Sequence, residues 1–240
     1  MNVLVVAAHP DDEVLGCGGT IARLIREGHQ VYIGILGEGI TSRYPSRDDA
    51  REAERSRLLS ASREAAALLG AGEPILHELP DNRFDTVPLL DVVKLIEDLV
   101  ERFRPAVVFT QHGGDLNVDH EVVFRATLTA TRPQATCPVK EVYAFEVPSS
   151  TDWAFGQFQP RFRPNVFMDV GATLETKIRA MQLYESEARL FPHPRSPEAL
   201  RALAQHWGST SGTGCAEAFE LIRSVRNGAW RWPVEELAGT

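Results

Sequence analysis

Short apolar runs alternate with longer amphipathic segments through the first half of the chain. The apolar runs contain almost no polar positions, which is typical of strands buried on both faces of a parallel sheet. Such strands are predicted at residues 3–8, 31–36 and 106–110, and a further strand, which contains His77 and Glu78, is predicted at residues 74–79. Apolar residues at helical spacing predict helices at residues 12–27, 49–69, 89–103 and 121–131. This fourfold alternation predicts an α/β fold, a Rossmann-like three-layer sandwich whose mostly parallel sheet is joined by right-handed crossovers.

The second half of the chain follows a less regular pattern. Two further strands are predicted at residues 141–147 and 165–170, with a segment rich in proline and arginine between them. Helices are predicted at residues 172–187, 198–206 and 215–225. Because no repeat, low-complexity tract or linker interrupts the pattern, we expect a single domain that spans residues 1–240.

Polar clusters follow the first and the fourth predicted strands. The first cluster is Ala8-His9-Pro10-Asp11-Asp12-Glu13, and the second runs from Gln111 to His120. Ligands bind beyond the carboxyl ends of the strands in such sheets, so we expect the two clusters to meet there. The polar segment 37–48 follows the second strand, and a loop of this length is typical of a lid or a binding loop.

The first cluster predicts a metal site. Zinc accepts an imidazole nitrogen and a carboxylate oxygen, and a catalytic site commonly has three protein ligands and an open position for water. His9 and Asp12 supply two ligands, and His112 and His120 are the candidates for the third. The competing interpretation is that the carboxylates only cap the next helix. One carboxylate would be enough for capping, whereas three adjacent carboxylates repel one another unless a cation offsets their charge.

The same cluster contains a candidate general base. A carboxylate that lies beside the metal without binding it can take a proton from activated water. Asp11 fits this role if Asp12 is the ligand, but the spacing also allows the reverse assignment.

Composition excludes several classes of protein. A net charge of −8 argues against a general nucleic-acid binder. No apolar run reaches the roughly 20 residues of a membrane span, and no basic leader segment follows Met1, so a cytoplasmic location is expected. The three cysteines form no CxxC pair and are expected to be reduced. The glycines of segment 16–19 do not match the dinucleotide fingerprint, so NAD binding is not expected.

The two polar clusters resemble the motifs of the PIG-L/LmbE family of zinc-dependent N-deacetylases. That family has AHPDD as its first motif and HPDH or HxDH as its second, matched here by segments 8–12 and 117–120. The similarity extends to segments 16–20, 184–187 and 216–219. The resemblance implies that His9, Asp12 and His120 bind zinc and that Asp11 is the general base. It also implies hydrolysis of an N-acetyl group on an amino sugar or sugar conjugate of the N-acetylglucosamine type.

The second motif departs from the HPDH form. That form has a histidine where this chain has Asn117. Asparagine can donate a hydrogen bond to an oxyanion but cannot carry a proton, so the catalytic role is either changed at Asn117 or passed to His112. Asp119 is expected either to orient His120 or to cap the helix that begins there. Substrate contacts are expected from Arg43, Tyr184, His193 and Arg195.

The resemblance implies one zinc ion per chain and a small N-acetylated sugar or sugar conjugate as the partner. A His/Asp/His ligand set also suits iron, cobalt or manganese. Two alternatives stay open: an amidase for another acyl group or a thiol conjugate, and a non-catalytic sugar or nucleotide-sugar binding protein. Asp11 discriminates against the second, because a binding protein needs no base beside the metal. The sequence does not decide between a monomer and a homo-oligomer.

Overall fold

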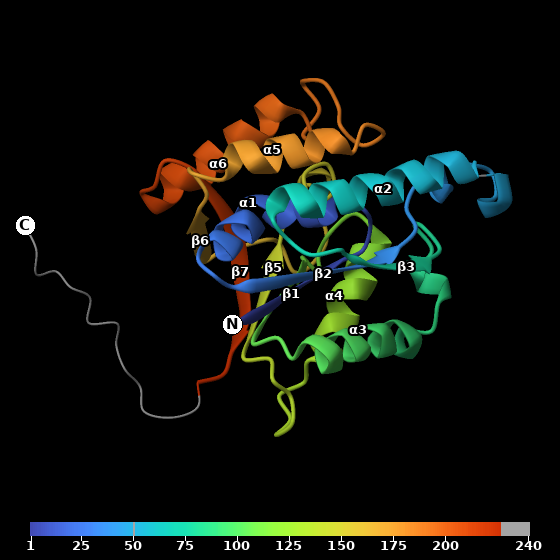
Figure 1. The fold of residues 1–240 in the computed structure, drawn as a ribbon, viewed down its shortest axis with the longest axis horizontal. Coiled ribbons are helices and arrows are strands. Elements are labelled where there is room, and N and C mark those ends of the chain that lie inside the picture. Colours follow the sequence, from blue (N-terminus) through green and yellow to red (C-terminus); the bar gives the residue numbers. More distant parts are fainter. Residues whose placement is uncertain (50, 227–240) are drawn as a thin grey trace, which may run out of the picture.

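A seven-stranded mixed sheet forms the centre of the molecule, in the order β3-β2-β1-β4-β5-β7-β6 (Figure 1). The computed structural model describes residues 1–49 and 51–226. Strands β3, β2, β1, β4 and β5 are parallel, and β7 runs antiparallel between β5 and β6. The strands are β1 (Asn2–Ala7), β2 (Gln30–Gly37), β3 (Ile75–Leu79), β4 (Val107–Gln111), β5 (Glu141–Phe145), β6 (Val166–Asp169) and β7 (Ala216–Ser224).

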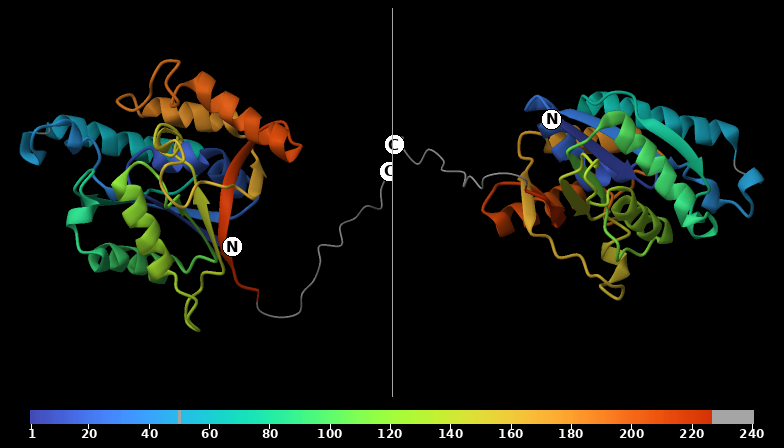
Figure 2. Two further views of the ribbon diagram at one scale, coloured as in Figure 1. Left: turned by 180° about the vertical axis from the view of Figure 1, so that it is seen from behind. Right: turned by 90° about the horizontal axis from the view of Figure 1, so that it is seen from below.

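Helices cover both faces of this sheet. They are α1 (Asp12–Arg26), α2 (Glu52–Leu69), α3 (Leu89–Phe103), α4 (Val118–Ala130), α5 (Leu174–Leu183) and α6 (Pro197–Ser211). Figures 1 and 2 show α2, α5 and α6 on one side of the sheet and α3 and α4 on the other. The predicted Rossmann-like three-layer fold with a mostly parallel sheet is confirmed. The expected domain boundary at residue 240 lies outside the described residues.

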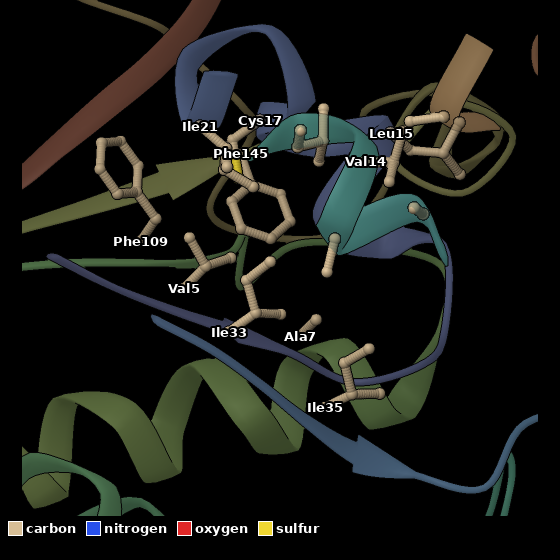
Figure 3. Close-up of a cluster of buried hydrophobic side chains, with 14 of the residues drawn as sticks. Val5, Ala7, Val14, Leu15, Cys17, Ile21, Ile33, Ile35, Phe109 and Phe145 are labelled. Atoms are coloured by element: carbon tan, nitrogen blue, oxygen red, sulfur yellow. The ribbon is translucent and has the colours of Figure 1, made fainter. Parts of the chain in front are cut away.

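Strand β1 shows why the buried strands read as continuous apolar runs. Its side chains alternate between two cores, one under α1 and α2 and the other against α3 and α4. Val5 and Ala7 belong to the first core, which Figure 3 shows, and Leu4 and Val6 belong to the second. Because both faces are covered, neither set of positions can be polar.

The predicted helix at residues 215–225 is wrong, because this segment forms β7. Its alanine, glutamate and leucine residues favour a helix, but tertiary packing overrides this weak preference. The ring of Phe219 packs edge-on against Phe109 of β4, with ring centroids 5.0 Å apart. Glu217 is buried because its carboxylate pairs with Lys177 of α5, at 2.6 Å. Pairing with β5 on one side and β6 on the other satisfies the backbone.

The order in which the chain adds strands to the sheet reverses between β1 and β4. From β1 the chain proceeds through β2 to β3 at one edge, whereas from β4 it proceeds to β5 on the other side. The carboxyl ends of β1 and β4 therefore flank a topological switch point, where α/β sheets bind ligands. Helices α1 and α4 begin at this point, so their first turns face the same space. In the part of the chain that the structure describes, no helix has the length and apolarity needed to cross a membrane.

Candidate metal centre and catalytic pocket

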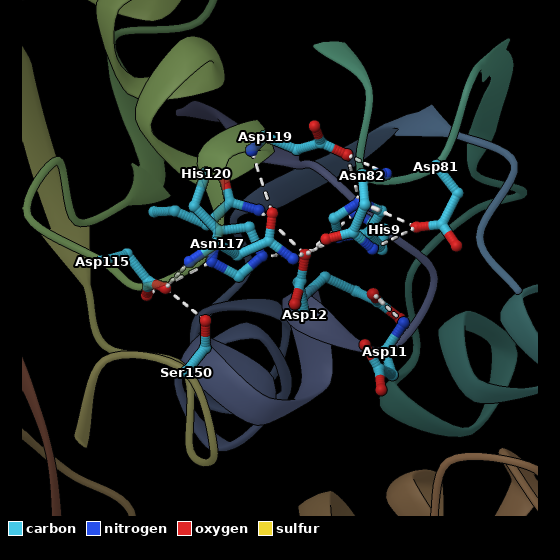
Figure 4. A network of polar contacts seen from close by, with 12 residues as sticks. His9, Asp11, Asp12, Asp81, Asn82, Asp115, Asn117, Asp119, His120 and Ser150 are labelled. Carbon is cyan, nitrogen blue, oxygen red and sulfur yellow. Dashed lines mark hydrogen bonds and ion pairs between the residues drawn. The ribbon is translucent and has the colours of Figure 1, made fainter. Parts of the chain in front are cut away.

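His9, Asp12 and His120 meet at the switch point (Figure 4). His9 lies just beyond β1, Asp12 begins α1, and His120 lies in the first turn of α4. The Oδ2 atom of Asp12 lies 3.4 Å from Nδ1 of His9 and 3.2 Å from Nε2 of His120. The three side chains are almost completely buried.

The spacing of these atoms fits a tetrahedral metal ion. Ligand atoms at about 2.0–2.2 Å from a tetrahedral zinc ion lie about 3.3–3.6 Å from one another. The two distances to Asp12 Oδ2, 3.4 Å and 3.2 Å, are close to this range. In addition, both ring nitrogens of His120 are buried and neither makes a hydrogen bond to any described residue. A buried bare nitrogen is costly unless a cation binds it, so the residues present fit a metal ion.

An outer carboxylate lies behind each histidine. Nε2 of His9 lies 2.8 Å from Oδ2 of Asp119, and Nδ1 of His120 lies 3.2 Å from Oδ2 of Asp115. An ionised carboxylate only accepts hydrogen bonds, so Nε2 of His9 donates to Asp119. If a metal ion binds, Nδ1 of His9 and Nε2 of His120, the ring nitrogens nearest to Asp12, would be the ligand atoms. Asp119 orients His9 and not His120, which corrects the expectation from the sequence, and Asn117 caps α4 instead.

His9, Asp81 and Asp119 form a second group with metal-like spacing. The carboxylate oxygens of Asp81 and Asp119 already accept hydrogen bonds from other parts of the protein. Oδ2 of Asp81 accepts from the backbone N–H of Ser42 at 3.0 Å, and Oδ1 accepts from Nδ2 of Asn82 at 3.0 Å. Asp119 accepts two backbone N–H groups in addition to His9. We therefore interpret Asp81 and Asp119 as support for His9.

His9, Asp12 and His120 shift one another's pKa values. Burial lowers the pKa of His120, but the charges of Asp12 and Asp115 outweigh it and raise this pKa to about 9. The pKa of His9 is also raised, because hydrogen bonds to Asp119 and Asp12 outweigh burial. Burial favours a higher pKa for Asp12, yet the charge of His120 brings it well below its usual value. A divalent cation held by these three groups would have to displace the protons of the two histidines.

Asp11 lies beside the ligands in an unusual backbone conformation. Its φ of 110° is in the left-handed region, which is unfavourable for a residue with a side chain. Its backbone N–H donates to Oε2 of Glu13 at 3.1 Å, and Oε1 of Glu13 accepts from the hydroxyl of Tyr184 at 2.5 Å. These contacts stabilise the backbone turn at Asp11, in which the side chains of Asp11 and Asp12 point in different directions.

The side chain of Asp11 suits a proton acceptor. Oδ2 accepts from Nη1 of Arg195 at 2.6 Å, and Oδ1 makes no hydrogen bond to any residue that the structure describes. Burial raises the pKa of Asp11, Arg195 opposes this rise, and the charge of Asp12 adds to it. Because Asp12 and not Asp11 points between the two histidines, the geometry favours Asp12 as ligand and Asp11 as base.

The ligands and Asp11 open onto a pocket of about 360 Å³. Residues from several separate parts of the chain form its wall. These include Gly39, Ile40, Ser42 and Arg43, which come from the loop predicted to be a lid or a binding loop, and Leu116, Asn117, Ser149, Trp153, Glu187 and Arg195.

Asn117 and His112 have different positions relative to this pocket. Asn117 lines it, and its Oδ1 accepts from the backbone N–H of Asp119 at 2.9 Å. His112 is fully buried outside the pocket lining. Its Nδ1 lies 2.7 Å from a carboxylate oxygen of Glu220, and its Nε2 lies 2.7 Å from the carbonyl oxygen of Pro160. The structure therefore does not place His112 where it could replace a catalytic histidine at position 117.

The four expected substrate contacts divide into two pairs. Arg43 and Arg195 line the pocket. Tyr184 is fully buried and bonded to Glu13, and His193 packs edge-on against Trp153 at a centroid distance of 5.2 Å without lining the pocket. Of the four, only Arg43 and Arg195 therefore lie on the wall of this pocket.

Three acidic residues of the site were not predicted. Asp81 follows the end of β3, and Asp115 follows the end of β4, so the strand-end rule that selected His9 could have selected both. Glu187 follows a helix and has no such signal.

The sequence model of the PIG-L family, described as GlcNAc-PI de-N-acetylase, matches residues 4–131. The chain belongs to the PIG-L family. The matched segment runs from β1 to the end of α4 and contains the three metal-ligand candidates, Asp11 and Asn117.

Known proteins resemble this PIG-L chain well beyond the matched segment. An uncharacterized deacetylase of Escherichia coli, YaiS, is 28% identical over 77% of this chain and 91% of its own length. The diacetylchitobiose deacetylase of Thermococcus kodakarensis is 26% identical over 93% of this chain and 84% of its own length. The 4-carboxy-2-hydroxymuconate hydratase GalB of Pseudomonas putida has the same fold, with a TM-score of 0.73, 22% identity and coverage of 95% and 99% of the two chains. The fold thus accommodates more than one reaction, and the site has to decide the function.

Proposed function

We propose that this PIG-L protein is a metal-dependent N-deacetylase that hydrolyses an N-acetyl amide on an amino sugar or sugar conjugate. The observation that carries the proposal is the joint placement of a metal-fitting His9/Asp12/His120 set and a separate carboxylate, Asp11, on one pocket. The diacetylchitobiose deacetylase among the relatives supports the substrate class. Zinc is the proposed metal and the cytoplasm the proposed location.

The residues of the pocket divide the reaction among them. A divalent ion held by His9, Asp12 and His120 would supply Lewis-acid polarisation of the amide carbonyl and a lower pKa for water. Asp11 accepts the proton of the attacking water and returns it to the amine nitrogen as the C–N bond breaks. Nδ2 of Asn117 donates a hydrogen bond to the developing oxyanion. Acetate and a free amine are the products.

Asp11 separates this proposal from non-catalytic sugar binding. A binding protein gains nothing from a buried carboxylate in a left-handed backbone conformation, which costs about 1–3 kcal/mol. Such strain is retained where it places a reacting group.

The test combines metal content with acetate release. The purified protein should contain about one zinc ion per chain and release acetate from at least one member of a panel of N-acetylglucosamine, diacetylchitobiose and N-acetylglucosamine conjugates. Asp11→Asn should retain the metal and lose about 10²- to 10⁴-fold in turnover. Asp91→Asn on the exposed surface of α3 is the matched control and should be fully active. Acetate release from no panel member by the zinc-loaded protein would contradict the proposed reaction.

A further inference from the structure

Four charged side chains of alternating sign connect the candidate base to the pocket loop. Nη1 of Arg195 lies 2.6 Å from Oδ2 of Asp11 and 3.2 Å from Oε2 of Glu187. Nη2 of Arg43 lies 2.6 Å from Oε1 of Glu187. We call these four residues the charge chain. They come from the turn after β1, the segments on either side of residue 190, and the loop after β2.

Arg195 is held firmly by the protein. Its Nε donates to Oγ of Ser149 at 2.8 Å, and its Nη1 is shared between Asp11 and Glu187. Two of its three nitrogens are thus bonded to protein oxygens, and its side chain is only 20% exposed. Because the guanidinium group is planar and rigid, fixing two nitrogens fixes the direction in which it meets the Asp11 carboxylate.

Asp11 needs such a partner. Its backbone is in the left-handed region, and its neighbours Asp12 and Glu13 are buried carboxyl groups. Repulsion between these carboxylates favours a rotation of the Asp11 side chain away from Asp12. Among the contacts of the described residues, Arg195 makes the ion pair that opposes such a rotation.

We propose that Arg195 is a positioning residue, which holds the Asp11 carboxylate in the orientation needed for proton transfer. Glu187, which forms an ion pair with Arg43, in turn holds Arg195 in place. This inference rests on the proposed function, in which Asp11 is the base. It assigns to Arg195 a role different from the substrate contact expected from the sequence. A substrate contact acts on binding, whereas a positioning residue acts on the chemical step.

The first experiment measures kcat and KM for Arg195→Met with the best substrate of the panel. A displacement of a reacting group by about 1 Å costs about 100-fold in rate, so kcat should fall about 100-fold while KM changes less than about threefold. Zinc content and melting temperature should stay near those of the parent. Arg195→Lys, which retains a charged donor, should recover about tenfold of the loss. Arg201→Met removes an exposed Arg–Glu pair remote from the pocket and should be fully active.

Glu187→Gln provides a second measurement that does not depend on how well Arg195→Met folds. It removes the negative charge that pairs with Arg195 but leaves the Asp11 and Arg195 side chains unchanged. A fall of about tenfold in kcat at unchanged KM is expected, since the guanidinium is then held by fewer partners. Unchanged kcat in Glu187→Gln would remove Glu187 from the proposal.

The decisive experiment combines Arg195→Met with Asp11→Asn. If Arg195 acts only through Asp11, the double variant should turn over no more than about twofold more slowly than Asp11→Asn alone, because coupled residues are not additive. A substrate clamp would instead raise KM in both backgrounds, and that result would overturn the proposal. Full activity of Asp11→Asn would contradict the base assignment itself. Loss of activity in Asp11→Asn together with normal kcat in Arg195→Met would contradict the positioning role alone.

Discussion

Replacement of Asp119 by asparagine should weaken the metal site while leaving all three ligands in place. Asp119 is completely buried. Its Oδ2 accepts from His9 Nε2 at 2.8 Å and from the backbone N–H of Asn82 at 2.6 Å, and its Oδ1 accepts from the backbone N–H of Phe84 at 2.8 Å. Asparagine has one acceptor oxygen, so its NH₂ group must face at least one of these donors.

The magnitude follows from the bonds that are lost. The least costly orientation keeps the oxygen on His9 and Asn82 and leaves the N–H of Phe84 without an acceptor. A buried donor without a partner costs about 1–3 kcal/mol, and the free energy of unfolding of the metal-free protein should fall by this amount. His9 also loses an anionic partner, which typically weakens metal binding about 10- to 100-fold, equivalent to about 1.4–2.7 kcal/mol.

Chelator competition measures the metal affinity, and urea denaturation of the metal-free protein measures the stability. Glu121→Gln, an exposed substitution on the same helix, is the control and should change neither quantity. An affinity of Asp119→Asn within twofold of the parent would refute the argument that this carboxylate sets the ligand strength of His9.

Two further predictions concern buried charges away from the pocket. Lys177→Met leaves the Glu217 carboxylate buried without its cation and should reduce the free energy of unfolding by about 3–5 kcal/mol in urea denaturation. Adding Glu217→Gln should recover part of this loss, and simple additivity would contradict the pairing. Burial raises the pKa of Glu146 to about 7 even though Trp207 Nε1 donates to it, so the folded protein binds this proton more tightly than the unfolded chain does. Stability should therefore fall as pH rises from about 4.5 to about 7, by at most about 3 kcal/mol. Glu146→Gln should flatten this slope in thermal melts at pH 5 and pH 8, and an unchanged slope would show that another group causes it.

The fold was predictable where local pattern and tertiary environment agree. In β1 every position after Asn2 is buried, so the apolar run alone indicates the strand. In β7 the local sequence pattern and the tertiary environment disagree. Glu217 is polar in sequence, yet it lies in the interior because Lys177, 40 residues away, neutralises it and the N–H groups of Gly19 and Thr20 donate to it. A partner so distant leaves no local pattern, and the helical preference of the segment then misleads.

The site shows the same division at the level of single side chains. The meeting of His9 and Asp12 with the segment of His112 and His120 was predictable because the ends of neighbouring parallel strands must meet, and the family resemblance selected His120. The carboxylate that contacts each histidine on its other side was not predictable. Asp119 adjoins His120 in sequence, but consecutive residues of a helix do not face each other, so Asp119 points to His9 and the earlier Asp115 reaches His120.

The departure of the second motif at Asn117 has a consequence for the whole pocket. As the cap of α4, Asn117 must direct its oxygen to the N–H of Asp119, which leaves Nδ2 as the atom available to the pocket. An asparagine held in this way is a fixed donor for an oxyanion, but it cannot carry a proton to the leaving amine. In the proposed reaction both proton transfers then fall to Asp11. A single carboxylate that must serve first the water and then the amine needs a well-defined position throughout, and this requirement gives the ion pair with Arg195 its purpose.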